Sequence, residues 1–181
     1  MKKIKTALIS VSDKKNLKPL LNSLKKNNIK IISSGGTYKE IKKLKFKCLE
    51  VSEFTNSPEI LEGRVKTLHP KIHAGILNKR KSKMHLKDLE KNNFENIDLV
   101  IVNFYPFAET LKNTKNHNKI IENIDVGGPT MVRSAAKNYN DVTIITSSDQ
   151  YAELIDELKK NKGSTSLEFR EKLSRIAFTE T

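Results

Sequence analysis

Two cations stand close together in a segment of this sequence that shows neither helical nor strand periodicity. Within residues 62–70, Arg64 and Lys66 lie two positions apart. In an extended conformation, side chains at this spacing point to the same side, where both can meet one anionic ligand. The segment therefore predicts an anion-binding loop, with a solvated basic loop as the simple alternative.

A glycine pair stands between a β-rich run and a helical pattern, in Ser34-Gly35-Gly36-Thr37. Glycines let a ligand approach the backbone, and the free N–H groups at the start of a helix attract anions. The segment lacks the spacing of a nucleoside-triphosphate loop and that of a dinucleotide-binding fold. It therefore predicts a phosphate cradle, with an ordinary strand-to-helix turn as the alternative.

Polar side chains also end two other predicted strands. Residues 10–14 supply hydroxyl groups and an ammonium group, although Ser12 or Asp13 could simply cap a helix. Asn103 and Tyr105 follow a strongly apolar run, as expected where a chain leaves a sheet beside a ligand. Both segments are candidates for ligand contacts.

Residues 125–138 place a glycine pair and a proline before a helical pattern rich in small residues. Proline favours the first position of a helix, and small side chains allow another backbone to come close. Lys137 lies within this pattern, where an exposed lysine without a catalytic role is the alternative. The segment is therefore a further candidate for the site.

Metal and redox chemistry are not indicated by the pattern. His69 and His73 are four positions apart, but Pro70 makes a continuous helix through both improbable, and no carboxylate or cysteine completes a zinc ligand set. The single cysteine, Cys48, cannot form an internal disulfide and lies in an apolar stretch, which favours a buried structural thiol.

Five β-rich runs separated by helical patterns must position these groups. The runs are residues 4–11, 29–33, 46–51, 97–103 and 142–146. Because parallel neighbours need crossover connections, the alternation predicts an α/β fold with a central, mostly parallel five-stranded sheet and helices on both faces. Ligands of such sheets bind beyond the carboxyl ends of the strands, where the polar segments lie.

Three other features of the pattern concern the connections. Ser12 and Asp13 are predicted to cap a helix over residues 17–24. Residues 52–70 show no clean periodicity and predict an unusually long, functional loop. Residues 164–181 predict a capped amphipathic helix suited to docking onto another surface.

The chain of 181 residues has the length of one domain and carries 34 Lys+Arg against 21 Asp+Glu, a net charge of +13. This charge favours anionic partners. We expect no nucleic-acid role, because aromatics make up 6% of residues and do not alternate with basic ones. The apolar runs are too short for a membrane span or signal peptide, so we expect a cytoplasmic protein.

Taken in order, seven segments resemble the IMP cyclohydrolase domain of bifunctional purine biosynthesis proteins. They are Ser-Val-Ser-Asp-Lys at 10–14, Ser-Gly-Gly-Thr at 34–37, Gly-Arg-Val-Lys-Thr-Leu-His-Pro at 63–70, His-Ala-Gly-Ile-Leu at 73–77, Asn-Phe-Tyr-Pro-Phe at 103–107, Asp-Val-Gly-Gly-Pro at 125–129 and Ala-Ala-Lys-Asn at 135–138. The match spans nearly the whole chain, and the run from Arg64 to Pro70 is its most specific part.

This resemblance implies a methylglyoxal-synthase-like domain over residues 1–181 that closes 5-formamidoimidazole-4-carboxamide ribotide to IMP, the last step of purine biosynthesis, without a metal or organic cofactor. Family members form homodimers and usually continue into a transformylase domain, which we do not expect within these residues. The alternative is a regulatory domain of the same fold that binds a phosphometabolite without turnover. Methylglyoxal synthase shares the fold but fits these segments less well.

The resemblance also assigns site residues. It places ligand contacts at Ser12, Asp13, Lys14, Ser34, Gly35, Gly36, Thr37, Arg64, Val65, Thr67, Asn103, Phe104, Val126 and Gly127. Our hypothesis is that Lys137 and Asp125 transfer protons while Lys66 and Tyr105 stabilise the formyl oxygen. Ring closure needs these functions because a carboxamide nitrogen is a poor nucleophile and hydroxide is a poor leaving group.

Overall fold

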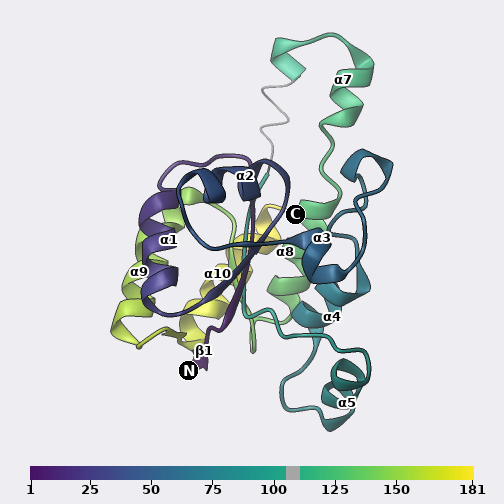
Figure 1. Cartoon of the computed structure of the whole chain (residues 1–181). Helices are drawn as coiled ribbons and strands as arrows, with labels where there is room; N and C mark the ends of the chain where they lie inside the picture. The colour runs from purple at the N-terminus through teal and green to yellow at the C-terminus, as the bar shows by residue number, and fades with distance from the viewer. Residues whose placement is uncertain (105–110) are drawn as a thin grey trace.

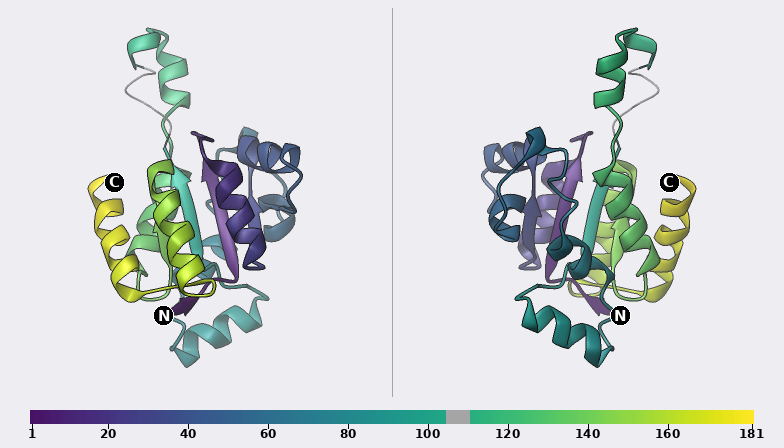
Figure 2. Two further views of the ribbon diagram at one scale, coloured as in Figure 1. Left: turned by 90° about the vertical axis from the view of Figure 1, so that its left-hand side faces the viewer. Right: turned by 90° about the vertical axis from the view of Figure 1, so that its right-hand side faces the viewer.

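A computed structural model describes residues 1–104 and 111–181 and shows a parallel sheet with helices on both faces (Figures 1 and 2). Its strands lie in the order β4-β3-β2-β5-β6, so the predicted fold class is confirmed. In chain order they are β2 (Thr6–Val11), β3 (Lys30–Ser33), β4 (Leu49–Glu50), β5 (Leu99–Asn103) and β6 (Thr143–Ile145). A separate antiparallel pair joins β1 (Lys2–Lys3) to β7 (Ser164–Thr165).

Helices α1 (Leu17–Lys26) and α9 (Tyr151–Lys160) pack together on one face, and α4 (Pro70–Leu77) and α8 (Gly127–Lys137) on the other (Figure 2). Helix α10 (Leu167–Thr179) packs on α8 and β6. The remaining elements are α2 (Gly35–Lys43), α3 (Val51–Thr55), α5 (Lys83–Lys91), α7 (His117–Glu122) and the short 3-10 helices η1 (Leu61–Gly63) and η2 (Ser148–Gln150). No helix in the described parts of the chain is long and apolar enough to cross a membrane.

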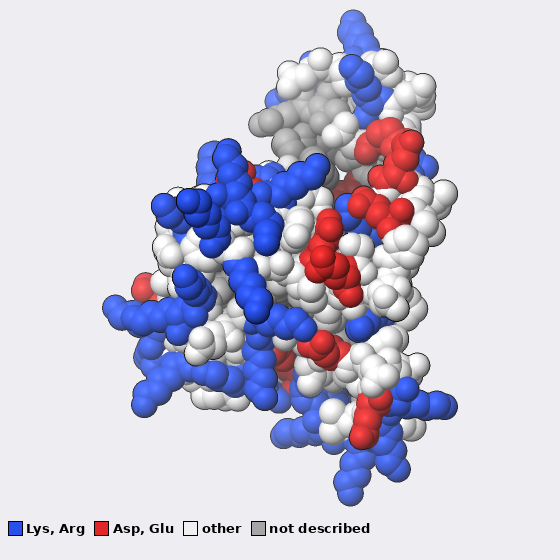
Figure 3. All heavy atoms as spheres, in the orientation of Figure 1, with Lys and Arg blue, Asp and Glu red and all other residues white. Residues whose placement is uncertain are grey.

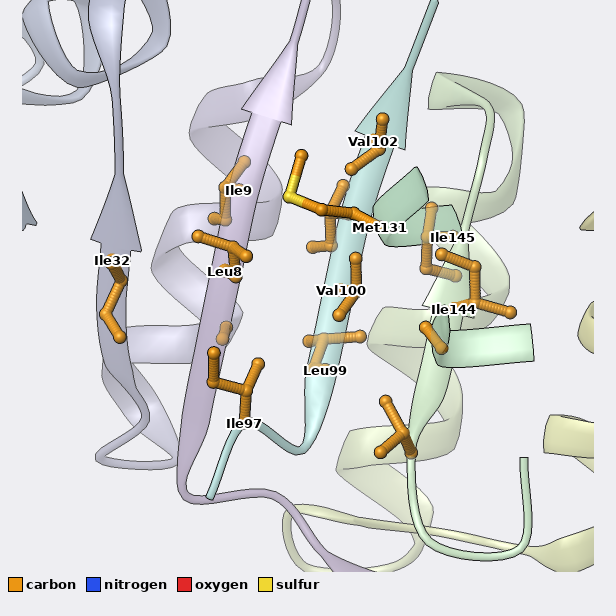
Figure 4. Packing of buried hydrophobic residues seen from close by; sticks show 14 of the residues in the cluster. Leu8, Ile9, Ile32, Ile97, Leu99, Val100, Val102, Met131, Ile144 and Ile145 are labelled. Atoms are coloured by element: carbon orange, nitrogen blue, oxygen red, sulfur yellow. The ribbon is translucent and has the colours of Figure 1, made fainter. Parts of the chain in front are cut away.

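The core lies on both sides of the central strands, which explains why their sequences are apolar without strict alternation. In Figure 4, Leu8 of β2, Val100 of β5 and Ile144 of β6 run across the sheet, and Met131 of α8 lies close to them. All four side chains are almost completely buried. The small residues predicted in α8 suit this packing, because Ala135 and its neighbour are buried as well.

The first helix begins where its apolar pattern predicts, but its cap is a different residue. It starts at Leu17 after Asn16, which has a left-handed backbone with φ 55° and makes no capping hydrogen bond through its side chain. The expected cap at Ser12 and Asp13 is wrong, because the backbone N–H groups of both residues donate to the side chain of Asn103. This contact carries the chain across the edge of the sheet before α1 begins.

The third predicted strand, residues 46–51, is mostly wrong. Only Leu49–Glu50 pairs with β3, and α3 begins directly afterwards at Val51. The predicted loop over residues 52–70 therefore contains most of α3 as well as η1. The strand is short because it lies at the edge of the sheet, where it pairs with only the last two residues of β3.

The terminal helix is confirmed. The Ser166 side chain accepts a hydrogen bond from the backbone N–H of Phe169 and so caps α10, which buries Phe169 and Leu173. Arg170, also on this helix, is 2% exposed and donates to three backbone carbonyl groups. The helix is thus fixed to the body of the domain, although Phe178 at its end stays 44% exposed.

Candidate active site

A cleft of about 680 Å³ opens beyond the carboxyl ends of β2, β3 and β5, where the sequence predicts the ligand site. Its walls are the starts of α2 and α8, the turn around η1 and the end of α7, which projects beyond this edge of the sheet (Figure 1). The predicted site residues that line it are Ser12, Lys14, Ser34, Gly35, Gly36, Thr37, Arg64, Lys66, Thr67, Asn103, Asp125, Val126 and Gly127.

The start of α2 has the features of an anion-binding site. The N–H groups of its first turn have no acceptor within the helix, and Gly35 has a φ of +55°, which a side chain would strain. A Cβ atom on Gly35 would lie 3.6 Å from Lys66 Nζ, and one on Gly36 would lie 3.9 Å from Lys14 Nζ. Two ammonium groups therefore converge on a helix N-terminus, the arrangement that binds phosphate.

Two predicted ligand residues position the cleft through their own hydrogen bonds. The Thr37 hydroxyl donates to the Val11 carbonyl oxygen (2.9 Å) and accepts from the Val11 N–H (3.0 Å). The Asn103 Oδ1 accepts from the N–H groups of Ser12 (2.6 Å) and Asp13 (3.0 Å), and its amide donates to the Asp13 carbonyl oxygen. These contacts fix the start of α2 and the loop after β2 against each other.

Arg64 and Lys66 both line the cleft, but the extended conformation predicted for them is wrong. Their segment is a series of turns, in which the Lys66 N–H donates to the Gly63 carbonyl oxygen (3.3 Å). Each cation is paired with a carboxylate: Arg64 Nη2 lies 2.6 Å from Glu122 Oε1, and Lys66 Nζ lies 2.5 Å from Glu59 Oε1. The anion-binding groups thus carry internal counter-ions.

The glycine pair before α8 allows two polar side chains to approach the backbone. The Asp125 Oδ1 accepts from the Gly128 N–H at 2.8 Å, and a Cβ atom on Gly128 would lie 2.2 Å from Asp125 Oδ2. A Cβ atom on Gly127 would lie 2.5 Å from Thr67 Oγ1. The second glycine-rich segment therefore brings a carboxylate and a hydroxyl group to the wall opposite α2.

Three predicted ligand residues do not line the cleft. The Asp13 carboxylate accepts from the Lys15 N–H (2.9 Å) and the Ser148 hydroxyl (3.2 Å), and the hydrogen bond from Lys15 does most to lower the pKa of Asp13. Val65 is absent from the cleft wall, and Phe104 packs against the hydrophobic core. The sequence could not show which residues of these segments face the cleft, because neighbouring residues in an extended segment point in opposite directions.

One predicted catalytic residue, Lys137, is not brought to this wall. Lys137 is the exposed last residue of α8, ten residues after Gly127, so the helical rise places it about 15 Å along the axis from Gly127 and about 9 Å beyond Met131, the last residue of α8 that lines the cleft. The structure does not bring it together with Asp125 of the same chain. Tyr105 lies outside the described residues.

Sequence reasoning missed the acidic side of the cleft. Glu59, Glu62 and Glu122 all contribute to its walls. Figure 3 shows the same contrast on the surface: basic side chains crowd over α1 and α2, while acidic side chains gather nearer to α7. No motif marked these glutamates, since each becomes part of the site only through the fold.

His69 and His73 both form hydrogen bonds within the protein. His69 accepts from the Lys71 N–H at the start of α4, and His73 Nδ1 lies 3.1 Å from the Ser134 hydroxyl of α8. Among residues 1–104 and 111–181, no group of three or more His, Cys, Asp or Glu side chains is placed to hold a metal ion. Cys48 is half-buried, and burial raises the pKa of its thiol to about 12.

Two protein-family models match different parts of this chain. Residues 16–130 match the MGS-like domain family, and residues 135–181 match the AICARFT/IMPCHase bienzyme family. The crystal structure of ForH superposes with a TM-score of 0.85 at 30% identity, covering 97% of this chain and 92% of that one. The chain therefore belongs to the MGS-like domain family.

Similar full-length proteins are bifunctional enzymes of purine biosynthesis. The chain is 52% identical over 97% of its length to the bifunctional purine biosynthesis protein PurH of Prochlorococcus marinus subsp. pastoris, and 48% identical over 98% to PurH of Acetivibrio thermocellus. It spans about a third of their lengths, 34% and 35%. The similarity is therefore to one part of an enzyme of purine biosynthesis.

His73 predicts a pH dependence of stability. Burial lowers its pKa below the ordinary value of 6.5, so the unfolded chain binds more protons than the folded chain between the lowered pKa and about 6.5. The free energy of unfolding should therefore fall on acidification through this interval. We expect the melting temperature of His73→Asn to fall less steeply from pH 7 to pH 5 than that of the wild type.

The matched control is His117→Asn, because His117 is exposed at the start of α7. This variant should keep the wild-type pH dependence. An unchanged slope in His73→Asn would contradict the assignment of the effect to the buried imidazole.

Proposed function

We propose that this cleft is an IMP cyclohydrolase site, in which 5-formamidoimidazole-4-carboxamide ribotide loses water to form IMP. The observation that carries the proposal is the convergence of Lys14 and Lys66 on the first turn of α2, in a cleft that also holds Asp125. A ribotide supplies the matching phosphate. The similarity to PurH supports a purine precursor over other phosphate esters.

The phosphate would bind at the start of α2. Backbone N–H groups of Gly36 and its neighbours point along the helix axis, and the ammonium group of Lys14 supplies a full positive charge beside them. The hydroxyl groups of Ser12 and Ser34 lie on the same wall. Phosphate contacts at this end leave the opposite wall, at the start of α8, for the ring that reacts.

The reaction itself needs proton transfer and charge stabilisation more than it needs proximity. The carboxamide nitrogen and the formyl carbon are already neighbours on one ring, so a C–N bond forms within a single molecule. The carboxamide nitrogen loses one proton and the formamido nitrogen loses a second. The formyl oxygen gains both and leaves as water, as its bond to carbon breaks and a C=N bond forms in the new ring. We assign proton transfer to Asp125 and stabilisation of the formyl oxygen to Tyr105, whereas Lys66, which lies beside Gly35 at the start of α2, is assigned to the phosphate.

The test is to mix the purified chain with the formylated ribotide and follow IMP by its absorbance. Wild-type chain should form IMP, and Asp125→Asn should reduce turnover by roughly 10²–10⁴, the usual contribution of a positioned acid or base. The control is Asp149→Asn, because Asp149 is an exposed acidic residue of η2 that does not line the cleft. Ribotide binding without IMP above the spontaneous rate would instead favour a regulatory domain.

Lys137 is placed where it could serve the cleft of a second chain. It is exposed at the end of α8 away from Asp125, which leaves it available to another molecule. We therefore propose a homodimer in which Lys137 of one copy serves the cleft of the other. A further proposed partner is a transformylase domain, which would supply the formyl ribotide. We also propose that the protein acts in the cytoplasm.

Mixed dimers test this arrangement. Asp125→Asn and Lys137→Ala chains should each be inactive alone, since each removes one proton-transferring group from every site. A randomly assorted equal mixture should regain about a quarter of wild-type turnover, because half of the dimers would contain one intact site. Wild-type turnover by Lys137→Ala alone, or no recovery in the mixture, would contradict the proposed role.

A further inference from the structure

The carboxylate of Glu59 occupies a position in the cleft that an anionic ligand would need. Its Oε1 lies 2.5 Å from Lys66 Nζ, the same ammonium group that lies beside Gly35 at the start of α2. We propose that Glu59 is a positioning residue: it holds Lys66 at the phosphate cradle as an internal counter-ion and is displaced by the phosphate of the ligand. This inference rests on the proposed function in taking the ligand to be a phosphate ester.

The backbone at Gly63 leaves room for the Glu59 carboxylate. Gly63 has a φ of +89°, and a Cβ atom there would lie 2.4 Å from Glu59 Oε1 and 3.7 Å from Lys66 Nζ. The carboxylate therefore lies over a residue that has no side chain. This brings Glu59 and Lys66 together across the turn formed by η1, seven residues apart in sequence.

The burial of the pair suits exchange with a ligand. Lys66 is 20% exposed, whereas Glu59 is 42% exposed, so the cation is held in the cleft and the carboxylate can turn out into solvent. Ion pairs at such exposed positions are weak. A phosphate at the start of α2 has the advantage of helix N–H groups and Lys14 in addition to Lys66, so it can replace Glu59 without a large cost.

The other glutamates of the cleft do not share this geometry. Glu122 pairs with Arg64 through side chains that are both 62% exposed, away from the glycines of α2. Glu62 lines the cleft but forms no ion pair with the described residues. Glu59 is therefore the carboxylate whose removal should change phosphate affinity through Lys66, and Glu62 is its natural control.

Calorimetric titration of the full chain with inorganic phosphate tests the proposal. Glu59→Gln removes the competing charge while keeping the shape of the side chain. It should bind phosphate about two- to fivefold more tightly than the wild type, the range expected for breaking an exposed ion pair. Glu62→Gln should change the binding free energy by less than half as much as Glu59→Gln does, and Glu59→Asp, which restores the charge, should reverse most of the gain.

A double-mutant cycle isolates the interaction with Lys66. In a Lys66→Met background, Glu59→Gln should no longer tighten phosphate binding, because no ammonium group is released. Equal gains in Glu59→Gln and Glu62→Gln, a gain that persists without Lys66, or weaker binding in Glu59→Gln would each overturn the proposal. Melting temperatures of all variants confirm that they are folded.

The two proposals fail in different ways. Phosphate binding with the expected effect of Glu59→Gln, but no formation of IMP from the ribotide, would refute the reaction and leave the role of Glu59 intact. Phosphate binding that is insensitive to Glu59 would refute only that role. A chain that binds no phosphate would refute both.

Discussion

The electrostatics at the start of α2 are the constraint on which the rest of the site depends. A helix N-terminus and two ammonium groups, those of Lys14 and Lys66, face one small volume. Concentrating positive charge in this way costs free energy unless an anion is present or counter-ions are built in. The hydrogen bonds of Thr37 and Asn103 keep this arrangement in place, and Glu59 offsets part of its charge.

The parallel sheet explains how remote segments reach this volume. The carboxyl ends of β2, β3 and β5 lie at one edge, so the segments that follow them converge without long loops. The long connection after β4 returns across the same edge and carries Arg64 and Lys66. The two glycines at the start of α8 then let Asp125 approach the backbone, so that its carboxylate joins the wall of the cleft.

Periodicity and the glycine motifs predicted the sheet and most of the cleft, because buried strands and helix starts are set by local sequence. The cap of α1 was mispredicted, because Asn103, distant in sequence, binds the N–H groups of Ser12 and Asp13 and the helix begins only after Asn16. Glu59 had no sequence signal, since its role depends on a turn. Lys137 was grouped with the cleft by resemblance, whereas the continuous α8 separates it from Asp125 within one chain.

We propose that the start of α2 binds the phosphate of a purine ribotide. The most direct test compares the binding of IMP and inosine to the same chain by calorimetry, since the two ligands differ only in the phosphate. We predict that IMP binds at least about 100-fold more tightly, because charge-assisted hydrogen bonds from the helix and Lys14 are lost with inosine. Equal affinities would show that the phosphate is not held there and would contradict the account.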